Sequence, residues 1–172
     1  MKVKKLLNLM QNEGLLTKEI EFHMKKKNLT KIEKDIFAIK GHLEKAQHNL
    51  EFINTLKDSK FSDWSLVGCY YAVYQSALSL LINKGFFSKN HDATLCILIK
   101  EYMKKELDEE DIKLLNNPQL RNEDILTYVQ SKEEREKASY STQILFDKEM
   151  ITELKKKAIV FVNKCREILE QK

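Results

Sequence analysis

The sequence predicts an all-α protein, an antiparallel up-and-down bundle of four to five core helices with a short N-terminal helical appendage. Only four Gly and one Pro occur among the 172 residues, and this scarcity of helix breakers favours long helices over a turn-rich β fold. Apolar residues also recur at alternating steps of three and four in three long stretches, the period of an amphipathic helix. We expect no strand.

Residues 1–28 form the predicted appendage, and residues 29–172 form the main domain. Leu6, Leu7 and Met10 give the first segment one apolar side. Gly14 is expected to break this helix, because glycine is unfavourable inside helices. The run from Lys25 to Lys27 is expected to be an exposed connector.

Two long helices are predicted next, over residues 30–57 and 62–83. The stripe of the first contains Ile32, Ile36, Ile39, Leu43, Ala46, Leu50 and Ile53. The second begins near Ser62 and Asp63, which can cap a helix, and its wide apolar surface indicates the most buried helix of the bundle. Gly85 supplies a stop, since a left-handed residue closes helices at little cost.

Shorter helices are predicted over residues 91–105, 109–115 and 122–137, and Asp147 caps the last helix. That helix has its own stripe, made of Ile151, Leu154, Ala158, Phe161, Cys165 and Ile168. Long striped helices joined by short loops are typical of an antiparallel bundle.

The charge and the cysteines restrict the class of protein. A net charge of +4 permits an acidic partner or RNA without demanding either. The lysines near the start and in the last helix have two interpretations, a solvated helix surface or a phosphate-facing patch. Three scattered cysteines are best explained as buried free thiols in a reducing compartment. With no membrane span and no signal peptide in view, we expect a soluble cytoplasmic protein.

We expect neither a metal nor a cofactor. His42 and His48 lie six positions apart, about 240° around a helix, so they cannot bind one metal from a single face. The phosphate-binding motifs GxxxxGK[ST] and GxGxxG are also missing from the sequence.

A tyrosine-rich segment is the first candidate site. Tyr71 and Tyr74 fall on the apolar stripe, and Tyr70 lies to one side of it. These rings are either ordinary core packing or a groove in which bases stack.

Two further segments carry candidate chemistry. Lys89 and His91 flank Asn90 at a helix start, where they can hold a phosphate or polar partner, although Asn90 can equally be only the helix cap. Arg135 ends a predicted helix, and Tyr140 follows in a polar loop. Arg135 can bind a carboxylate, a phosphate or a neighbouring helix end, or simply hold the loop in place.

Taken in order, these segments resemble the HEPN family, specifically its small stand-alone prokaryotic members. The resemblance is carried by five stretches, residues 70–77, 83–85, 89–91, 135–140 and 158–169, supported by residues 42–50. It implies a helical bundle that commonly dimerises, and association with RNA or with a nucleotidyltransferase in a toxin–antitoxin pair. No membrane association is implied.

In nuclease members of the family, an Arg and a His four to six residues apart act at the dimer interface on the RNA 2′-hydroxyl. The resemblance assigns these positions to Arg135 and Tyr140, so tyrosine replaces the histidine. Gln75 likewise stands where the family's second helix has a histidine. An unperturbed tyrosine has a pKa of about 10 and is a poor base at neutral pH.

Three hypotheses about function follow. The first is a dimeric binding module for RNA, a nucleotide or a partner nucleotidyltransferase. The second is a metal-independent ribonuclease that uses Arg135 with Tyr140 or His91. The third is a structural bundle that binds a small nucleotide-like ligand beside Tyr71 and Tyr74.

Overall fold

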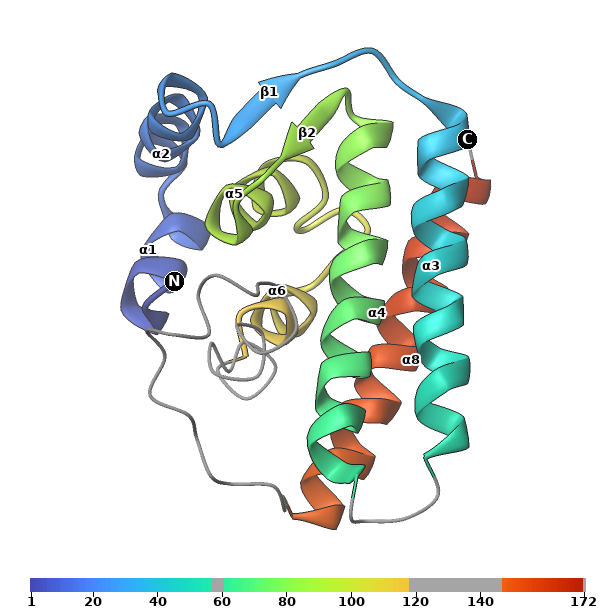
Figure 1. Cartoon of the computed structure of the whole chain (residues 1–172). Helices are drawn as coiled ribbons and strands as arrows, with labels where there is room; N and C mark the ends of the chain where they lie inside the picture. The colour runs from blue at the N-terminus through green and yellow to red at the C-terminus, as the bar shows by residue number, and fades with distance from the viewer. Residues whose placement is uncertain (57–60, 118–146, 172) are drawn as a thin grey trace, which may run out of the picture.

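The computed structural model describes residues 1–56, 61–117 and 147–171 of the chain. Within these ranges the protein is a helical bundle with one small sheet (Figure 1), which confirms the predicted all-α class. In chain order the elements are α1 (Val3–Gln11), α2 (Glu13–Lys25), β1 (Leu29–Lys31), α3 (Ile36–Thr55), α4 (Ser62–Asn83), β2 (Phe86–Ser88), α5 (His91–Glu101), α6 (Glu109–Leu115) and α8 (Lys148–Glu170).

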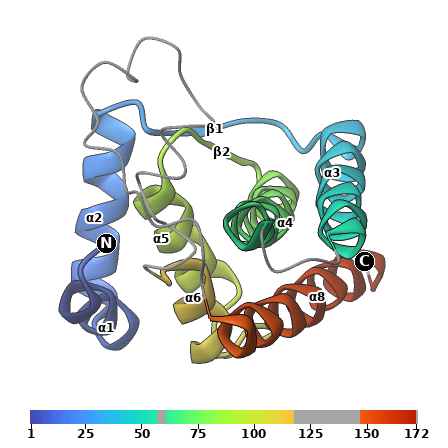
Figure 2. The ribbon, with the colours of Figure 1, turned by 60° about the horizontal axis from the view of Figure 1, so that its bottom comes forward.

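Helix α4 lies at the centre of the molecule. Helices α3 and α8 pack along one side of it, and α5 and α6 contact another side. Figure 2 shows α4 nearly end-on, with α3 and α8 around it and α5 between α4 and α2. The helix that the sequence predicted as the most buried is therefore the central one.

The N-terminal helices pack onto α5 from the side opposite α4. Leu6, Leu9, Leu16 and Ile20 are buried and belong to the same continuous core as the long helices. Because burying apolar surface is the main favourable term in folding, these four residues attach α1 and α2 to the rest of the protein.

In the described part of the chain, five helices begin at an Asn or Asp whose side chain accepts a hydrogen bond from the backbone N–H three residues later. These N-caps are Asn12 (α2), Asp35 (α3), Asn90 (α5), Asp108 (α6) and Asp147 (α8). Each bond satisfies one of the backbone donors that a helix start leaves without a partner. The predicted caps at Asn90 and Asp147 are therefore present.

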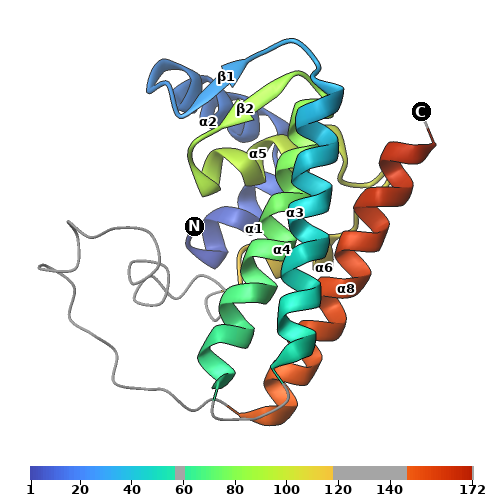
Figure 3. The same ribbon diagram turned by 45° about the vertical axis from the view of Figure 1, so that its right-hand side comes forward.

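The expectation of no strand is wrong at one place. β1 pairs antiparallel with β2, and Thr30 lies opposite Phe87. Gly85 precedes β2 with a φ of +74°, the left-handed conformation predicted for it. The two-stranded ribbon lies at the same end of the molecule as the start of α3 (Figure 3).

This ribbon also corrects the first long helix. α3 begins at Ile36 and not at residue 30, because residues 29–31 pair with β2 and Asp35 caps the helix. Ile39, Ala46, Leu50 and Ile53 are buried as their spacing predicted. Ile32 and Ile36 are exposed, so their assignment to the core was wrong.

Other boundaries differ by smaller amounts. The chain breaks at Asn12, and Gly14 lies inside the first turn of α2. α4 begins at Ser62, with Phe61 at its N-cap position and no capping bond from the Phe61 side chain. α5 ends at Glu101. The helix predicted over 122–137 lies outside the described residues.

Helix α4 is long and apolar enough to cross a membrane, but 83% of that stretch is buried inside the fold. This burial fits the core helix of a soluble protein. The three cysteines are buried as predicted, and burial raises the pKa of the thiols of Cys69 and Cys96 to about 12. Thiols with such high pKa values are unreactive near neutral pH.

Candidate ligand site

Two helices bring three rings of the predicted site together. Tyr70 and Tyr74 lie one turn apart on α4, and their ring centroids are 5.6 Å apart with planes 9° from parallel. His91, the first residue of α5, stacks on Tyr74 with a centroid distance of 5.6 Å and lies 6.2 Å from Tyr70. We call these three residues the ring cluster.

The burial of the tyrosines reverses the expected order. Tyr70 is 7% exposed, whereas Tyr71 and Tyr74 are half-buried. Tyr71 contacts Tyr70 edge-on, with centroids 5.3 Å apart. Burial raises the pKa of the Tyr74 hydroxyl, and a hydrogen bond with Thr94 opposes that rise. Tyr74 is therefore a neutral hydrogen-bonding phenol at physiological pH.

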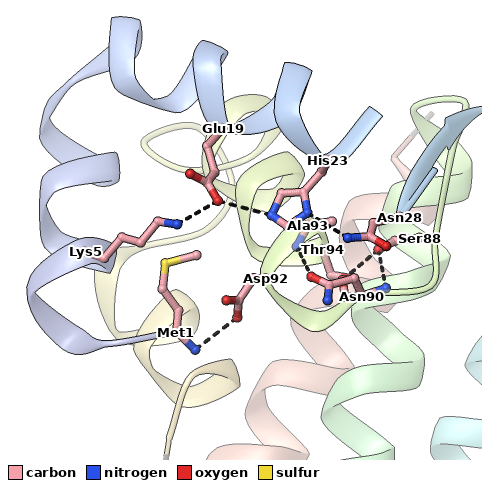
Figure 4. A network of polar contacts seen from close by, with 10 residues as sticks. All are labelled: Met1, Lys5, Glu19, His23, Asn28, Ser88, Asn90, Asp92, Ala93 and Thr94. Carbon is pink, nitrogen blue, oxygen red and sulfur yellow. Dashed lines mark hydrogen bonds and ion pairs between the residues drawn. The ribbon is translucent and has the colours of Figure 1, made fainter. Parts of the chain in front are cut away.

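The start of α5 is closed by its own side chains. Asn90 Oδ1 accepts from the N–H of Ala93 at 3.0 Å, and Ser88 Oγ accepts from the N–H of Asn90 at 3.2 Å (Figure 4). Asp92 adds a carboxylate in the first turn, which disfavours a second anion there. This geometry supports Asn90 as a helix cap and does not support a phosphate site at this helix start.

Lys89 and His91 consequently have different surroundings. Lys89 is exposed and follows β2, whereas the His91 ring packs against the two tyrosines. The structure brings His91 together with Tyr70 and Tyr74, and it leaves Lys89 on the adjoining surface.

A polar network joins the N-terminal segments to one another, and Asp92 of α5 pairs with the amino group of Met1 at 3.0 Å (Figure 4). Glu19 lies 2.7 Å from Lys5 Nζ and 3.3 Å from His23 Nε2. Asn28 Nδ2 lies 3.4 Å from His23 Nδ1. Because an amide nitrogen can only donate, His23 Nδ1 accepts and the ring proton is on Nε2, facing Glu19. His23 thus has a structural role, in linking α2 to Asn28 just before β1.

Gln75 has a defined partner at the position where the family resemblance expects histidine. Its Oε1 lies 2.6 Å from Nδ1 of His42 on α3. Since an amide oxygen can only accept, the imidazole donates this bond. The pair links α3 to α4, an interaction that the sequence reasoning did not foresee because 33 residues separate its two members.

Arg135 and Tyr140 lie outside the described residues. Among the residues that the structure describes, no group of three or more His, Cys, Asp or Glu side chains could hold a metal ion. The bond between Tyr74 and Thr94 was also missed by sequence reasoning. The sequence does not reveal that Thr94, inside α5, faces Tyr74 on α4.

The model of the HEPN domain family matches residues 39–168, which include all of α3 from Ile39 onward, α4, α5, α6 and most of α8. This chain belongs to the HEPN family. The ring cluster lies inside the matched range, whereas α1, α2 and β1 precede it. The HEPN fold therefore accounts for the bundle, and the N-terminal helices and β1 are additions to the matched part.

A relative from Methanocaldococcus jannaschii, named "Putative toxin MJ0142", is 30% identical over 131 residues. The similarity covers 76% of this chain and 80% of that protein. Among solved structures, none matches the chain. The two similarities agree in covering most of the HEPN bundle.

Proposed function

We propose that this HEPN protein is of the toxin type and acts as a homodimeric binding module for RNA or a nucleotide. The observation that carries the proposal is the ring cluster, in which His91 stacks on Tyr74 within a HEPN bundle. The name of the M. jannaschii relative supports the toxin type.

The ring cluster suits recognition of a base. Tyr74 is half-buried, so part of its ring can meet a ligand. Both ring nitrogens of His91 are buried, so His91 contributes mainly by holding the Tyr74 ring in place. Stacking of a base on an aromatic side chain contributes about 1–3 kcal/mol and tolerates any base. The exposed Lys89, two residues before His91, supplies a positive charge for an adjoining phosphate.

A partner nucleotidyltransferase belongs to the same proposal, because a toxin-type protein requires a protein that restrains it. We place the pair in the cytoplasm, where a reducing environment keeps Cys69, Cys96 and Cys165 as thiols. Residues 1–28 are proposed as an appendage to the domain of residues 29–172.

Metal-independent ribonuclease activity is the second candidate. A histidine can move protons near neutral pH, and His91 stacks on the Tyr74 ring in the ring cluster. In this alternative, Arg135 stabilises the developing charge on phosphate, and His91 or Tyr140 assists.

One experiment separates the two candidates. The purified protein is incubated with total RNA and with tRNA in EDTA, beside Arg135→Ala, Tyr140→Phe and His91→Ala. We expect RNA to be retarded in a gel without being cleaved. His48→Ala, which changes an exposed histidine on α3, is the matched control for His91→Ala.

Cleavage that disappears with Arg135→Ala would show a nuclease and replace the binding module. Affinity for RNA should fall about tenfold or more in Tyr74→Leu, which keeps apolar volume but removes the ring. Failure to bind RNA, combined with no thermal shift from nucleotides, would remove the proposal. Light scattering tests the homodimer, and a monomer at all concentrations would contradict it.

A further inference from the structure

Residues 30–37 are exposed at every position. Three of them are large and apolar: Ile32 is 37% exposed, Ile36 51% and Phe37 90%. Phe87, opposite Thr30 in the sheet, is 37% exposed. Large apolar side chains usually stabilise a protein by being buried, and these four are on the surface instead. A group of exposed apolar side chains often marks a binding site.

The same part of the chain is strongly basic. Residues 25–40 contain six lysines against Glu33 and Asp35, a net charge of +4 that equals the net charge of the whole chain. All six lysines are exposed. Asp35 is occupied as the cap of α3, where it accepts from the N–H of Ala38 at 3.0 Å. The protein's excess positive charge is thus concentrated around the ribbon.

Basic and apolar side chains alternate on this surface. The N–H of Lys89 donates to Asn28 O, and the N–H of Ile32 donates to Gly85 O, so the ladder continues beyond β1 and β2 at both ends. Because side chains two positions apart share a face of a strand, Lys89 and Phe87 lie on one face of the ribbon together with Ile32. Thr30, opposite Phe87, shares this face, whereas Lys31 lies on the other face with the buried Leu29. Thr30, Ile32, Phe87 and Lys89, with the exposed residues 33–37 that follow, form what we call the ribbon surface.

We propose that the ribbon surface binds single-stranded RNA, with its lysines on the phosphates and Phe37 and Phe87 under unpaired bases. Exposed rings within a line of positive charges are the two components of single-strand binding sites. Bases in a duplex are stacked on one another and cannot reach such rings. This inference rests on the proposed function and adds an RNA contact whose first strand, β1, precedes the matched HEPN range.

The alternation of side chains disfavours other occupants. The centres of protein interfaces are depleted of lysine. A second copy docking through the same surface would face lysines with lysines, which is repulsive.

Fluorescence anisotropy with a labelled single-stranded RNA of mixed sequence tests the proposal. Lys34→Glu/Lys89→Glu should weaken binding at least tenfold and reduce the slope of log affinity against log salt by about 1.4, which corresponds to two phosphate contacts. Lys148→Glu/Lys156→Glu, at exposed positions on α8, makes the same charge change elsewhere and should stay within about threefold of the wild type.

Phe37→Ala should weaken binding about fivefold or more, the loss expected for one stacked base. Because Phe37 is 90% exposed, its thermal unfolding should match that of the wild type, so lost binding would not reflect lost folding. Val160→Ala, at a position on α8 that is 63% exposed, is the control for removing exposed apolar surface.

The results also separate this inference from the proposed function. Binding that is lost in Tyr74→Leu but kept in both ribbon variants would overturn the ribbon surface and leave the ring cluster. Binding lost only in the ribbon variants would support the ribbon surface and remove the ring cluster as the RNA site. Binding to anionic phospholipid vesicles that depends on Phe37, without RNA binding, would replace RNA by a membrane.

Discussion

Helix α4 is buried along most of its length, whereas residues 30–37 are exposed throughout, although both stretches carry apolar residues at helical spacing. α4 has neighbours on several sides, since α3, α5, α6, α8 and β2 all contact it. The stripe of α3 is buried only where it faces α4, from Ile39 onward. Apolar periodicity therefore identifies the face of a segment that can be buried. The neighbouring elements decide how much of that face is buried in the folded protein.

The largest change in stability is expected at Gly68, where α4 packs tightly against α3. A Cβ at Gly68 would lie 2.1 Å from Cγ2 of Ile53 and 3.5 Å from Cδ1 of Phe52. Alanine in a helix gains about 1 kcal/mol over glycine, but this overlap forces the two helices apart. We expect Gly68→Ala to lower the free energy of unfolding by about 2 kcal/mol net, measured by urea denaturation.

A double-mutant cycle sharpens this prediction. Ile53→Ala removes the Cγ2 atom that the new methyl group would meet, so Gly68→Ala should cost much less in its presence. Additive losses from the two substitutions would show that the contact between α3 and α4 is looser than the geometry indicates.

A smaller loss of stability is expected from a substitution that removes a hydrogen bond to the C-terminal end of α4. Tyr102 is fully buried, and its hydroxyl donates to Leu80 O at 2.8 Å and accepts from Asn83 Nδ2 at 3.2 Å. This bond satisfies a backbone carbonyl in the last turn of the helix. Tyr102→Phe should lower the free energy of unfolding by about 1–2 kcal/mol.

The matched control for Tyr102→Phe is Tyr71→Phe, which removes a hydroxyl from a half-buried ring. Its effect on denaturant unfolding should stay within about 0.5 kcal/mol. Equal losses in the two variants would contradict a special role for the bond to Leu80.

The smallest expected change in the free energy of unfolding is a gain, and it is expected at Gly41 on α3. Gly41 is exposed, and a Cβ there would meet no atom within 4 Å. Gly41→Ala should therefore raise the free energy of unfolding by about 0.5–1 kcal/mol, the ordinary gain in helix propensity. Thermal denaturation measures it, and a loss of stability would mean that this face of α3 is covered in solution.

Local signals predicted several helix boundaries, but they missed the start of α3 at the Asp35 cap and the break at Asn12. The bounds of α4 and α6 agree with residues 62–83 and 109–115, and α8 begins directly after the Asp147 cap. Hydrogen bonds between an Asn or Asp side chain and the next turn of backbone depend on a few consecutive residues. Such features can be read from the sequence without knowledge of the fold.

The ribbon and the ring cluster could not be predicted in this way. Leu29–Lys31 is too short to show a strand period, and its partner Phe86–Ser88 lies more than 50 residues later. Tyr70 and Tyr74 share one side of a helix by their spacing, but His91 joins them only because α5 packs against α4. Both features depend on contacts between distant parts of the chain.

The sequence by itself determined the helical class, the order and approximate bounds of the long helices, the burial of the three cysteines and the resemblance to the HEPN family. Tertiary structure decided which apolar side chains lie in the core, which rings stack, and that residues 29–31 pair with residues 86–88. The physical reason is that helix formation and capping use bonds within a few residues. Burial, in contrast, depends on the element that packs opposite each side chain.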